Sequence, residues 1–238
     1  MEFSASMMCA DFGCLRDEVH ALDEAGIDKY HIDIMDGMFV PNMGMGLQDI
    51  KCIRSLTDKT IEAHLMVCKV NSYIDILASA GVNTVFIHPE ADYHPFTTLQ
   101  RIIDLGMRPG IVLDPGTSVE TVRELFNVSR NVLVMAVTPG FAGQSYLPYV
   151  AGKIRELLAL KERYGLRIYW DGSCTLDKIA EFAPMGVDGF VLGTNILFKR
   201  NSRGGGLTLH ALMKQETPPS RKYELRRNFC RRDRLKNA

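Results

Sequence analysis

Two histidines and two aspartates interrupt segments that otherwise have the composition of buried β-strands. His31 and Asp33 stand two positions apart in one apolar run, so their side chains point to the same face of a strand. His64 lies near the end of the following run, and Asp171 ends a much later one. Strands that are buried on both faces normally carry almost only apolar residues. Polar side chains at these positions therefore need a chemical reason.

Imidazole and carboxylate groups together are typical ligands of a divalent metal ion. Each residue alone has an ordinary structural explanation, since a histidine in a strand is more often a hydrogen-bonded core residue and an aspartate at a strand end often caps a helix. Two buried carboxylates without a counter-charge would, however, cost several kcal/mol per ion, and one cation removes that cost. We therefore expect His31, Asp33, His64 and Asp171 to hold one divalent cation (Zn, Fe, Mn, Co or Mg).

Short loops of small residues follow the last three predicted strands. They span 139–144 (PGFAGQ), 171–173 (DGS) and 193–194 (GT). Small residues let backbone N–H groups approach an anion, and helix N-termini add a favourable dipole. Every barrel needs tight loops, but the loops after strands 7 and 8 are also the usual phosphate site of an α/β barrel. Their position favours a phosphate-binding role.

Eight short apolar runs rich in β-branched residues position these groups, and amphipathic stretches separate them. One such stretch carries Leu15, Val19 and Leu22 and ends at Gly26. Eightfold alternation of strand and helix predicts a parallel sheet that closes into a single (β/α)8 TIM barrel. An open doubly wound sheet is the alternative, but it needs a glycine-rich first turn, which residues 7–11 lack. The predicted strands are Phe3–Met7, Lys29–Ile34, Ile61–Val67, Thr84–Ile87, Arg108–Leu113, Val132–Val137, Leu166–Trp170 and Gly189–Leu192.

Two further stretches have helical spacing. Ser118 is a suitable N-cap for the first of them. The apolar stripes are Val119, Val122, Leu125 and Phe126 in the first, and Leu176, Ile179 and Phe182 in the second.

Length and composition fit a single globular domain. The chain has 238 residues, within the roughly 200–250 of an α/β barrel, and 46% of them are hydrophobic. No apolar run approaches the ~20 residues of a membrane span, and the N-terminus lacks the basic and apolar regions of a secretory signal. We expect a cytoplasmic protein without membrane binding. The six cysteines form no C-x-x-C pair and are predicted to be reduced thiols.

Charge is divided unevenly along the chain. Basic and acidic residues number 28 each, but residues 199–238 hold 12 basic and 3 acidic side chains. We expect residues 1–200 to form the catalytic barrel, 201–216 a weak final barrel helix that follows three glycines, and 217–238 a basic, disordered tail. Basic clusters also bind nucleic acid, but this tail has few interleaved aromatic residues, so a solvated extension is preferred. Removal of the tail should leave folding and activity nearly unchanged.

Several motifs resemble, in order, the signature of the ribulose-phosphate 3-epimerase family. They are the segments 31–37 (HIDIMDG), 39–42 (FVPN), 64–66 (HLM), 134–135 (VM) leading into 139–144 (PGFAGQ), and 171–172 (DG). The resemblance runs from Ser4 to about Phe198. It implies a (β/α)8 barrel that epimerises ketose phosphates at C3 without an organic cofactor. We also expect a homo-oligomer.

The resemblance implies roles for individual residues. His31, Asp33, His64 and Asp171 match the family's metal ligands, and Asp33 and Asp171 match its two catalytic carboxylates. Removal of a proton next to a carbonyl gives an enediolate whose charge a metal can stabilise, and inversion needs a base on one face and an acid on the other. The implied substrate contacts are Ser6, His64, Gly140, Phe141, Ala142, Gly143, Gly172, Ser173, Gly193 and Thr194.

Departures from the family pattern bear on the substrate. Ala142, Ser173 and Thr194 replace the Gly, Gly and Ser usual in the pentulose enzymes and resemble the D-allulose-6-phosphate 3-epimerase branch. We therefore expect conversion of D-allulose 6-phosphate to D-fructose 6-phosphate, with D-ribulose 5-phosphate to D-xylulose 5-phosphate as the alternative. A phosphate-binding decarboxylase on the same barrel is a remoter alternative, because the Asp-x-Lys-x-x-Asp run of those enzymes is absent from the sequence.

Four other residues keep two interpretations open. Met35, Met66 and Met135 match the apolar lining of the family's site, and simple core packing explains them equally well. For His88, a substrate contact and a hydrogen-bonded core position fit equally. Asp114 stands where relatives often carry Asn.

Overall fold

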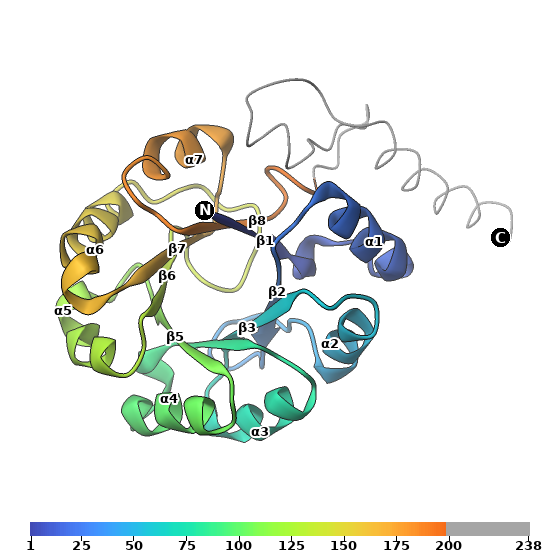
Figure 1. Ribbon diagram of the computed structural model, residues 1–238, viewed down its shortest axis with the longest axis horizontal. Helices are drawn as coiled ribbons and strands as arrows, with labels where there is room; N and C mark the ends of the chain where they lie inside the picture. The colour runs from blue at the N-terminus through green and yellow to red at the C-terminus, as the bar shows by residue number, and fades with distance from the viewer. Residues whose placement is uncertain (199–238) are drawn as a thin grey trace, which may run out of the picture.

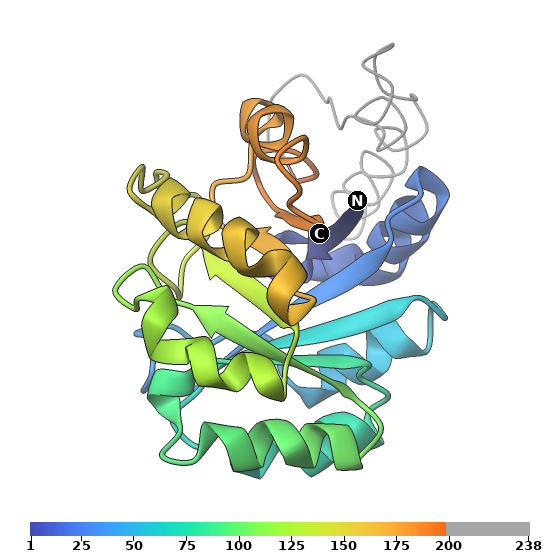
Figure 2. The same ribbon diagram turned by 60° about the vertical axis from the view of Figure 1, so that its left-hand side comes forward.

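The predicted closed barrel of eight parallel strands is confirmed by the computed structural model, which describes residues 1–198. The strands form an inner ring with the helices outside it (Figure 1), and the turned view shows the helices lying against the outer face of the sheet (Figure 2). Consecutive strands are neighbours throughout, and β1 closes the ring by pairing with β8. The strands are β1 (Glu2–Ser6), β2 (Lys29–Met35), β3 (Thr60–Met66), β4 (Thr84–Ile87), β5 (Arg108–Leu113), β6 (Asn131–Met135), β7 (Arg167–Asp171) and β8 (Gly189–Leu192).

The helices follow the predicted apolar stripes, with one difference. Gly26 ends α1 in the left-handed conformation, with φ of 83°, and the Ser118 side chain caps α5 by accepting a hydrogen bond from the Thr121 backbone N–H. The stripe that begins at Val119 gives only one α-helical turn, Val119–Val122, and continues as a 3₁₀ helix over Arg123–Asn127. The α-helices are α1 (Leu15–Ala25), α2 (Leu47–Arg54), α3 (Asn71–Ser79), α4 (Pro95–Asp104), α5 (Val119–Val122), α6 (Val150–Tyr164) and α7 (Leu176–Phe182). The 3₁₀ helices are η1 (Met7–Cys9), η2 (Phe12–Cys14), η3 (Pro89–Ala91) and η4 (Arg123–Asn127).

Strand register brings the polar residues of different strands to one level of the barrel. Asp33 of β2 is the direct partner of His64 of β3. On the other side of the ring, Met135 of β6 is the direct partner of Asp171 of β7. Since parallel strands share one direction, their C-terminal ends open at the same mouth, and the polar residues collect there.

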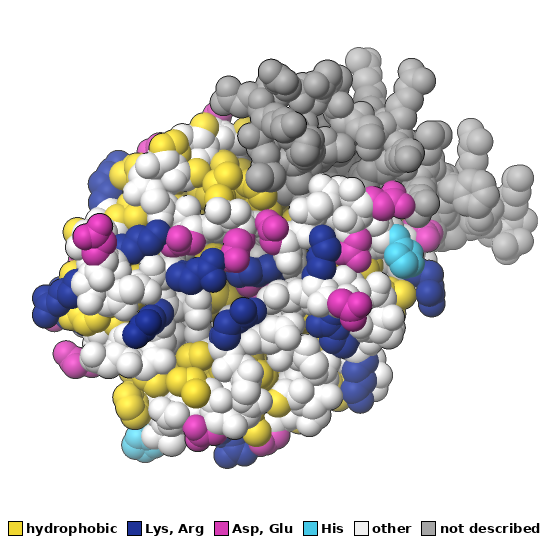
Figure 3. All heavy atoms as spheres, viewed as in Figure 1, with side chains coloured by type: hydrophobic (Ala, Val, Ile, Leu, Met, Phe, Trp, Pro, Cys, Tyr) yellow, Lys and Arg dark blue, Asp and Glu magenta, His cyan; other side chains and the backbone are white. Residues whose placement is uncertain are grey.

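Some expectations concern features that the described residues do not test. The final helix at 201–216 and the tail at 217–238 lie outside them. No helix within residues 1–198 is long and apolar enough to cross a membrane, and the expected cytoplasmic location stays a prediction. On the described part of the face in Figure 3, basic side chains are interspersed with acidic ones.

Candidate active site

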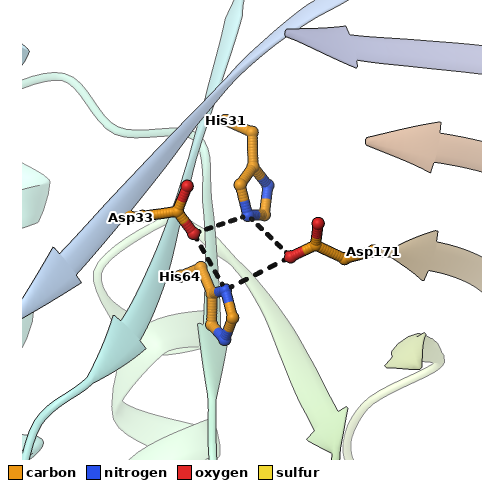
Figure 4. A group of neighbouring side chains, drawn as sticks. All are labelled: His31, Asp33, His64 and Asp171. Atoms are coloured by element: carbon orange, nitrogen blue, oxygen red, sulfur yellow. Dashed lines mark hydrogen bonds and ion pairs between the residues drawn. The ribbon is translucent and has the colours of Figure 1, made fainter. Parts of the chain in front are cut away.

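Four side chains from three strands converge at the C-terminal mouth of the barrel (Figure 4). Asp33 Oδ1 lies 3.4 Å from His31 Nε2 and 3.2 Å from His64 Nδ1. Asp171 Oδ2 lies 3.7 Å from each of the same two nitrogens. One ligand atom from each residue falls within 4.8 Å of all the others. The structure therefore brings together all four residues that the sequence singled out as metal ligands.

The donor set fits a divalent cation. His31 is fully buried, and its Nε2 has no hydrogen-bond partner among the described residues. Its other ring nitrogen, Nδ1, lies 2.9 Å from Glu62 Oε1, so Glu62 accepts the Nδ1 proton. Burial lowers the pKa of His31, but Asp33, Glu62 and Asp171 outweigh burial and raise it well above its ordinary value. A bound cation would take the place of the Nε2 proton that faces Asp33 and Asp171. A buried, unpartnered imidazole nitrogen aimed at two carboxylates is an arrangement that a cation completes.

His64 is held from behind by a second histidine. Its Nε2 lies 2.9 Å from His88 Nε2, and the two rings stack with centroids 5.1 Å apart. His88 is fully buried, and burial together with the charge of His64 holds the pKa of His88 well below its ordinary value. A neutral His88 accepts the Nε2 proton of His64. The Nδ1 of His64, which lies 3.2 Å from Asp33 Oδ1, is then the nitrogen that would bind a cation. His88 is thus a hydrogen-bonded core residue.

The two aspartates have pKa values that are pushed in opposite directions. Burial raises the pKa of Asp33, but His31 and His64 outweigh burial, so this pKa lies below its ordinary value. For Asp171, burial dominates and the charge of Asp33 adds to it, so its pKa is raised. Ser6 donates a hydrogen bond to Asp33 Oδ2 at 3.0 Å, which further supports the ionised form of Asp33. An ionised and a protonated carboxyl group side by side can act as base and acid.

A pocket is lined by the two aspartates. Met35, Met66 and Met135 also line it, so these methionines border the pocket as well as pack in the barrel. His64 does not line the pocket, so the structure places this expected substrate contact only in the four-residue cluster. The other expected substrate contacts that line the pocket are Ser6, Gly140, Phe141, Ala142, Gly143, Gly172, Ser173, Gly193 and Thr194.

Backbone conformation explains the small residues of the expected phosphate loops. Gly140, Gly143 and Gly172 have φ of 114°, 81° and 91°, a region that side chains disfavour. A Cβ at Gly172 would lie 2.5 Å from Val137 Cγ2. Ser173, with φ of 45°, is the one non-glycine residue with positive φ in the described chain, and such backbone strain is often found at ligand sites.

Sequence inspection overlooked two residues of this region. Glu62 is buried with its carboxylate against His31, and Asn42 donates a hydrogen bond to the Gly140 carbonyl. The signal for Glu62 was available, because it stands two positions before His64 and therefore shares its face of the strand. Asn42 belongs to the 39–42 motif, but the sequence gives no sign of its partner, because Gly140 lies in a distant loop.

Comparisons with known proteins agree with this geometry. Residues 2–197 match the ribulose-phosphate 3 epimerase family. The ribulose-phosphate 3-epimerase of Synechocystis is 37% identical over 80% of this chain and 85% of its own length. The enzyme of the same name from Methanocaldococcus jannaschii is 34% identical over 84% of this chain and 85% of its own length.

Solved structures support the fold independently. Phosphoribosyl anthranilate isomerase from Thermus thermophilus superposes with a TM-score of 0.61 at 11% identity, covering 83% of this chain and 89% of that one. Identity this low shows the barrel fold alone. The family match and the sequence relatives go further: this chain belongs to the ribulose-phosphate 3-epimerase family, and it is an isomerase that epimerises a carbohydrate.

Proposed function

We propose that this protein is a metal-dependent epimerase that inverts C3 of D-ribulose 5-phosphate to give D-xylulose 5-phosphate. The observation that carries the proposal is the meeting of Asp33 and Asp171 in the lining of one pocket, beside two histidines that complete a possible metal site. The relatives named above support the pentulose substrate, which the sequence had favoured only as an alternative.

In the proposed reaction the two carboxylates exchange roles with direction. Ionised Asp33 removes the proton from C3, which lies next to the carbonyl, and leaves an enediolate. Protonated Asp171 then delivers its proton to the opposite face of C3, so the configuration inverts. The reverse reaction begins with Asp171 ionised and Asp33 protonated, as the symmetry of an epimerisation requires.

Other residues of this chain prepare the site for that step. His31 and His64, with the two aspartates, would hold a divalent cation, which when bound supplies positive charge that stabilises the negative oxygens of the substrate. Met35, Met66 and Met135 give an apolar pocket wall that keeps water from the reacting carbon. The loops that carry Gly140–Gly143, Gly172–Ser173 and Gly193–Thr194 would bind the phosphate through backbone N–H groups.

A hexulose phosphate is the second candidate substrate. Ala142, Ser173 and Thr194 all line the pocket, and these are the positions at which the sequence resembles the D-allulose-6-phosphate branch. The relatives reported above carry the pentulose name, so the comparisons do not support the hexulose preference that the sequence suggested.

A side-by-side assay tests both substrates. The metal-loaded enzyme is given D-ribulose 5-phosphate and D-allulose 6-phosphate, and kcat/KM is measured for each. We expect the pentulose phosphate to be the better substrate. The triple variant A142G/S173G/T194S serves as the matched comparison, and a strong gain in pentulose activity there, with a hexulose preference in the native chain, would favour the second candidate. Turnover of neither substrate would overturn the proposal.

A further inference from the structure

Below the metal cluster, the interior of this barrel is apolar on one side and charged on the other. Strands β4 to β8 contribute a buried apolar cluster that includes Phe86, Leu133, Tyr169 and Val191. Strands β2 and β3 instead carry buried charged residues, among them Lys29, His31 and Glu62. Barrel interiors are usually filled by layers of branched apolar side chains. Buried charged residues beneath a candidate metal site therefore need an explanation beyond core packing.

A chain of charge contacts runs down the charged side from the metal cluster. Glu62 is 1% exposed, and its Oε1 lies 2.9 Å from His31 Nδ1. Its other oxygen, Oε2, lies 3.5 Å from Lys29 Nζ. Lys29 is 8% exposed and reaches Glu2 Oε2 at 2.7 Å. The chain ends at a polar cavity at the N-terminal end of the barrel, which Glu2, Lys29 and Arg167 help to line.

The charged side chains along this chain of contacts face side chains of opposite charge. Lys29 supplies the counter-charge for Glu62 and also lies over the ring of Tyr169, 4.5 Å from its centroid. Glu2 in turn meets Arg167 at 3.0 Å. Buried charges persist in proteins when they are paired in this way. Among these contact-chain residues, Glu62 is the one that contacts the metal cluster, through His31.

We infer that Glu62 is a positioning residue for the metal ligand His31, with Lys29 as the counter-ion that holds Glu62 in place. A histidine ligand must offer one unprotonated nitrogen, and a carboxylate that accepts from the other N–H fixes both the tautomer and the orientation of the ring. Glu62 accepts from the Nδ1 side of the ring, and His31 Nε2 is thereby turned toward Asp33 and Asp171. The inference rests on the metal site proposed above.

His64 offers an internal contrast. It is the other histidine of the cluster, and its outer nitrogen meets the neutral ring of His88 rather than a carboxylate. Loss of the Glu62 carboxylate should therefore remove the hydrogen-bond partner of His31 alone, while His64 keeps its contact with His88.

The test is cobalt binding by the full-length metal-free protein. The variants are E62Q, which keeps an acceptor oxygen, E62L, which removes it, and E2Q as the matched control in the same charge chain. Glu2 joins the chain at Lys29, two contacts further from His31 than Glu62 is. The Co2+ dissociation constant, the visible absorption spectrum of bound Co2+ and the melting temperature of each metal-free form are measured.

We expect E62L to bind Co2+ about 10–100-fold more weakly than the native protein, the usual cost of losing an outer-shell partner. The Co2+ affinity of E62Q should fall between those of E62L and the native protein. Its Co2+ spectrum should be altered, because the ring of His31 is less well oriented. E2Q should bind nearly as the native protein does. Melting temperatures separate positioning from folding: in E62Q the metal-free protein should melt close to the native value while affinity falls.

Two results would contradict the inference itself, and two others would contradict the metal site on which it rests. Native-like Co2+ affinity and spectrum in E62L and E62Q would remove any positioning role from Glu62. An equal loss in E2Q would point to general electrostatics instead of the contact with His31. Failure of the native protein itself to bind Co2+, or binding that survives in H64A at full strength, would instead overturn the metal site on which the inference rests.

Discussion

Asn42, in the loop between β2 and α2, donates a hydrogen bond from Nδ2 to the carbonyl oxygen of Gly140, 2.7 Å away and 98 residues later in the chain. Val40, two residues earlier, packs on the same glycine, since a Cβ at Gly140 would lie 3.0 Å from Val40 Cβ. The β2–α2 loop thus holds the loop after β6, which lines the pocket and is expected to bind phosphate. Loop position and substrate affinity should be linked through this one contact.

The variant N42A should raise KM for the ketose phosphate about tenfold and change kcat less. A hydrogen bond of this kind contributes about 1–1.5 kcal/mol, which corresponds to roughly a factor of ten in binding. Steady-state kinetics measure both constants. N127A is the matched control, because Asn127 makes a similar side-chain contact to the Glu124 carbonyl on the surface. Equal effects of the two variants would argue against a specific role for Asn42.

Substitution of either aspartate by Asn should abolish net epimerisation, because Asn cannot exchange protons at neutral pH. Each variant should still exchange the C3 proton with solvent deuterium in one of the two epimers, the one whose proton the remaining carboxylate removes. General-base catalysis is typically worth ~10²–10⁴-fold, so the missing exchange is visible in a proton spectrum. D104N, at the exposed end of α4, is the control. Near-normal epimerisation by metal-loaded D33N or D171N would rule out the two-carboxylate scheme.

Chelation of the cation should stop turnover and lower the melting temperature, and added metal should reverse both effects. An ion present at a thousand times its dissociation constant stabilises the folded state by about 4 kcal/mol, or roughly 10 °C for a chain of this size. Calorimetry with and without chelator checks the shift. H64A should show little metal-dependent shift, and an undiminished one would place the cation elsewhere.

The raised pKa of Asp114 should make the stability difference between the native protein and D114N depend on pH. Burial, followed by the charge of Glu90, raises its pKa to about 6 in the folded protein. The folded state therefore binds this proton more tightly than the unfolded state does, so the contribution is favourable below pH 4 and is lost as the pH rises through 6. D114N should be the more stable protein at pH 8 by about 1 kcal/mol, after allowance for solvent screening.

Urea unfolding of native protein and D114N at pH 4, 6 and 8 measures this difference. The difference between their free energies of unfolding should be smallest at pH 4 and largest at pH 8. E90Q should narrow the gap, because the Glu90 charge is one cause of the raised pKa. A gap that is independent of pH would contradict the assignment.

The sequence by itself determined the architecture and the identity of the metal-site candidates. Residue spacing of two put His31 and Asp33 on one face of a strand, and eight alternations of strand and helix predicted the closed barrel that the structure shows. Both signals are local, because side-chain direction alternates within a strand and amphipathic periodicity lies within a helix. Local patterns also placed the helix ends at Gly26 and Ser118.

Only the tertiary structure decided which of these residues meet and what supports them. Asp33 lies beside His64 because β2 and β3 pair in that register, and Asp171 joins them across the ring from 107 positions beyond His64. The Glu62 contact with His31 and the Asn42 contact with Gly140 depend on the same long-range packing. Periodicity encodes the face on which a side chain lies, but its partner is set by how eight strands close, and that is a property of the whole barrel.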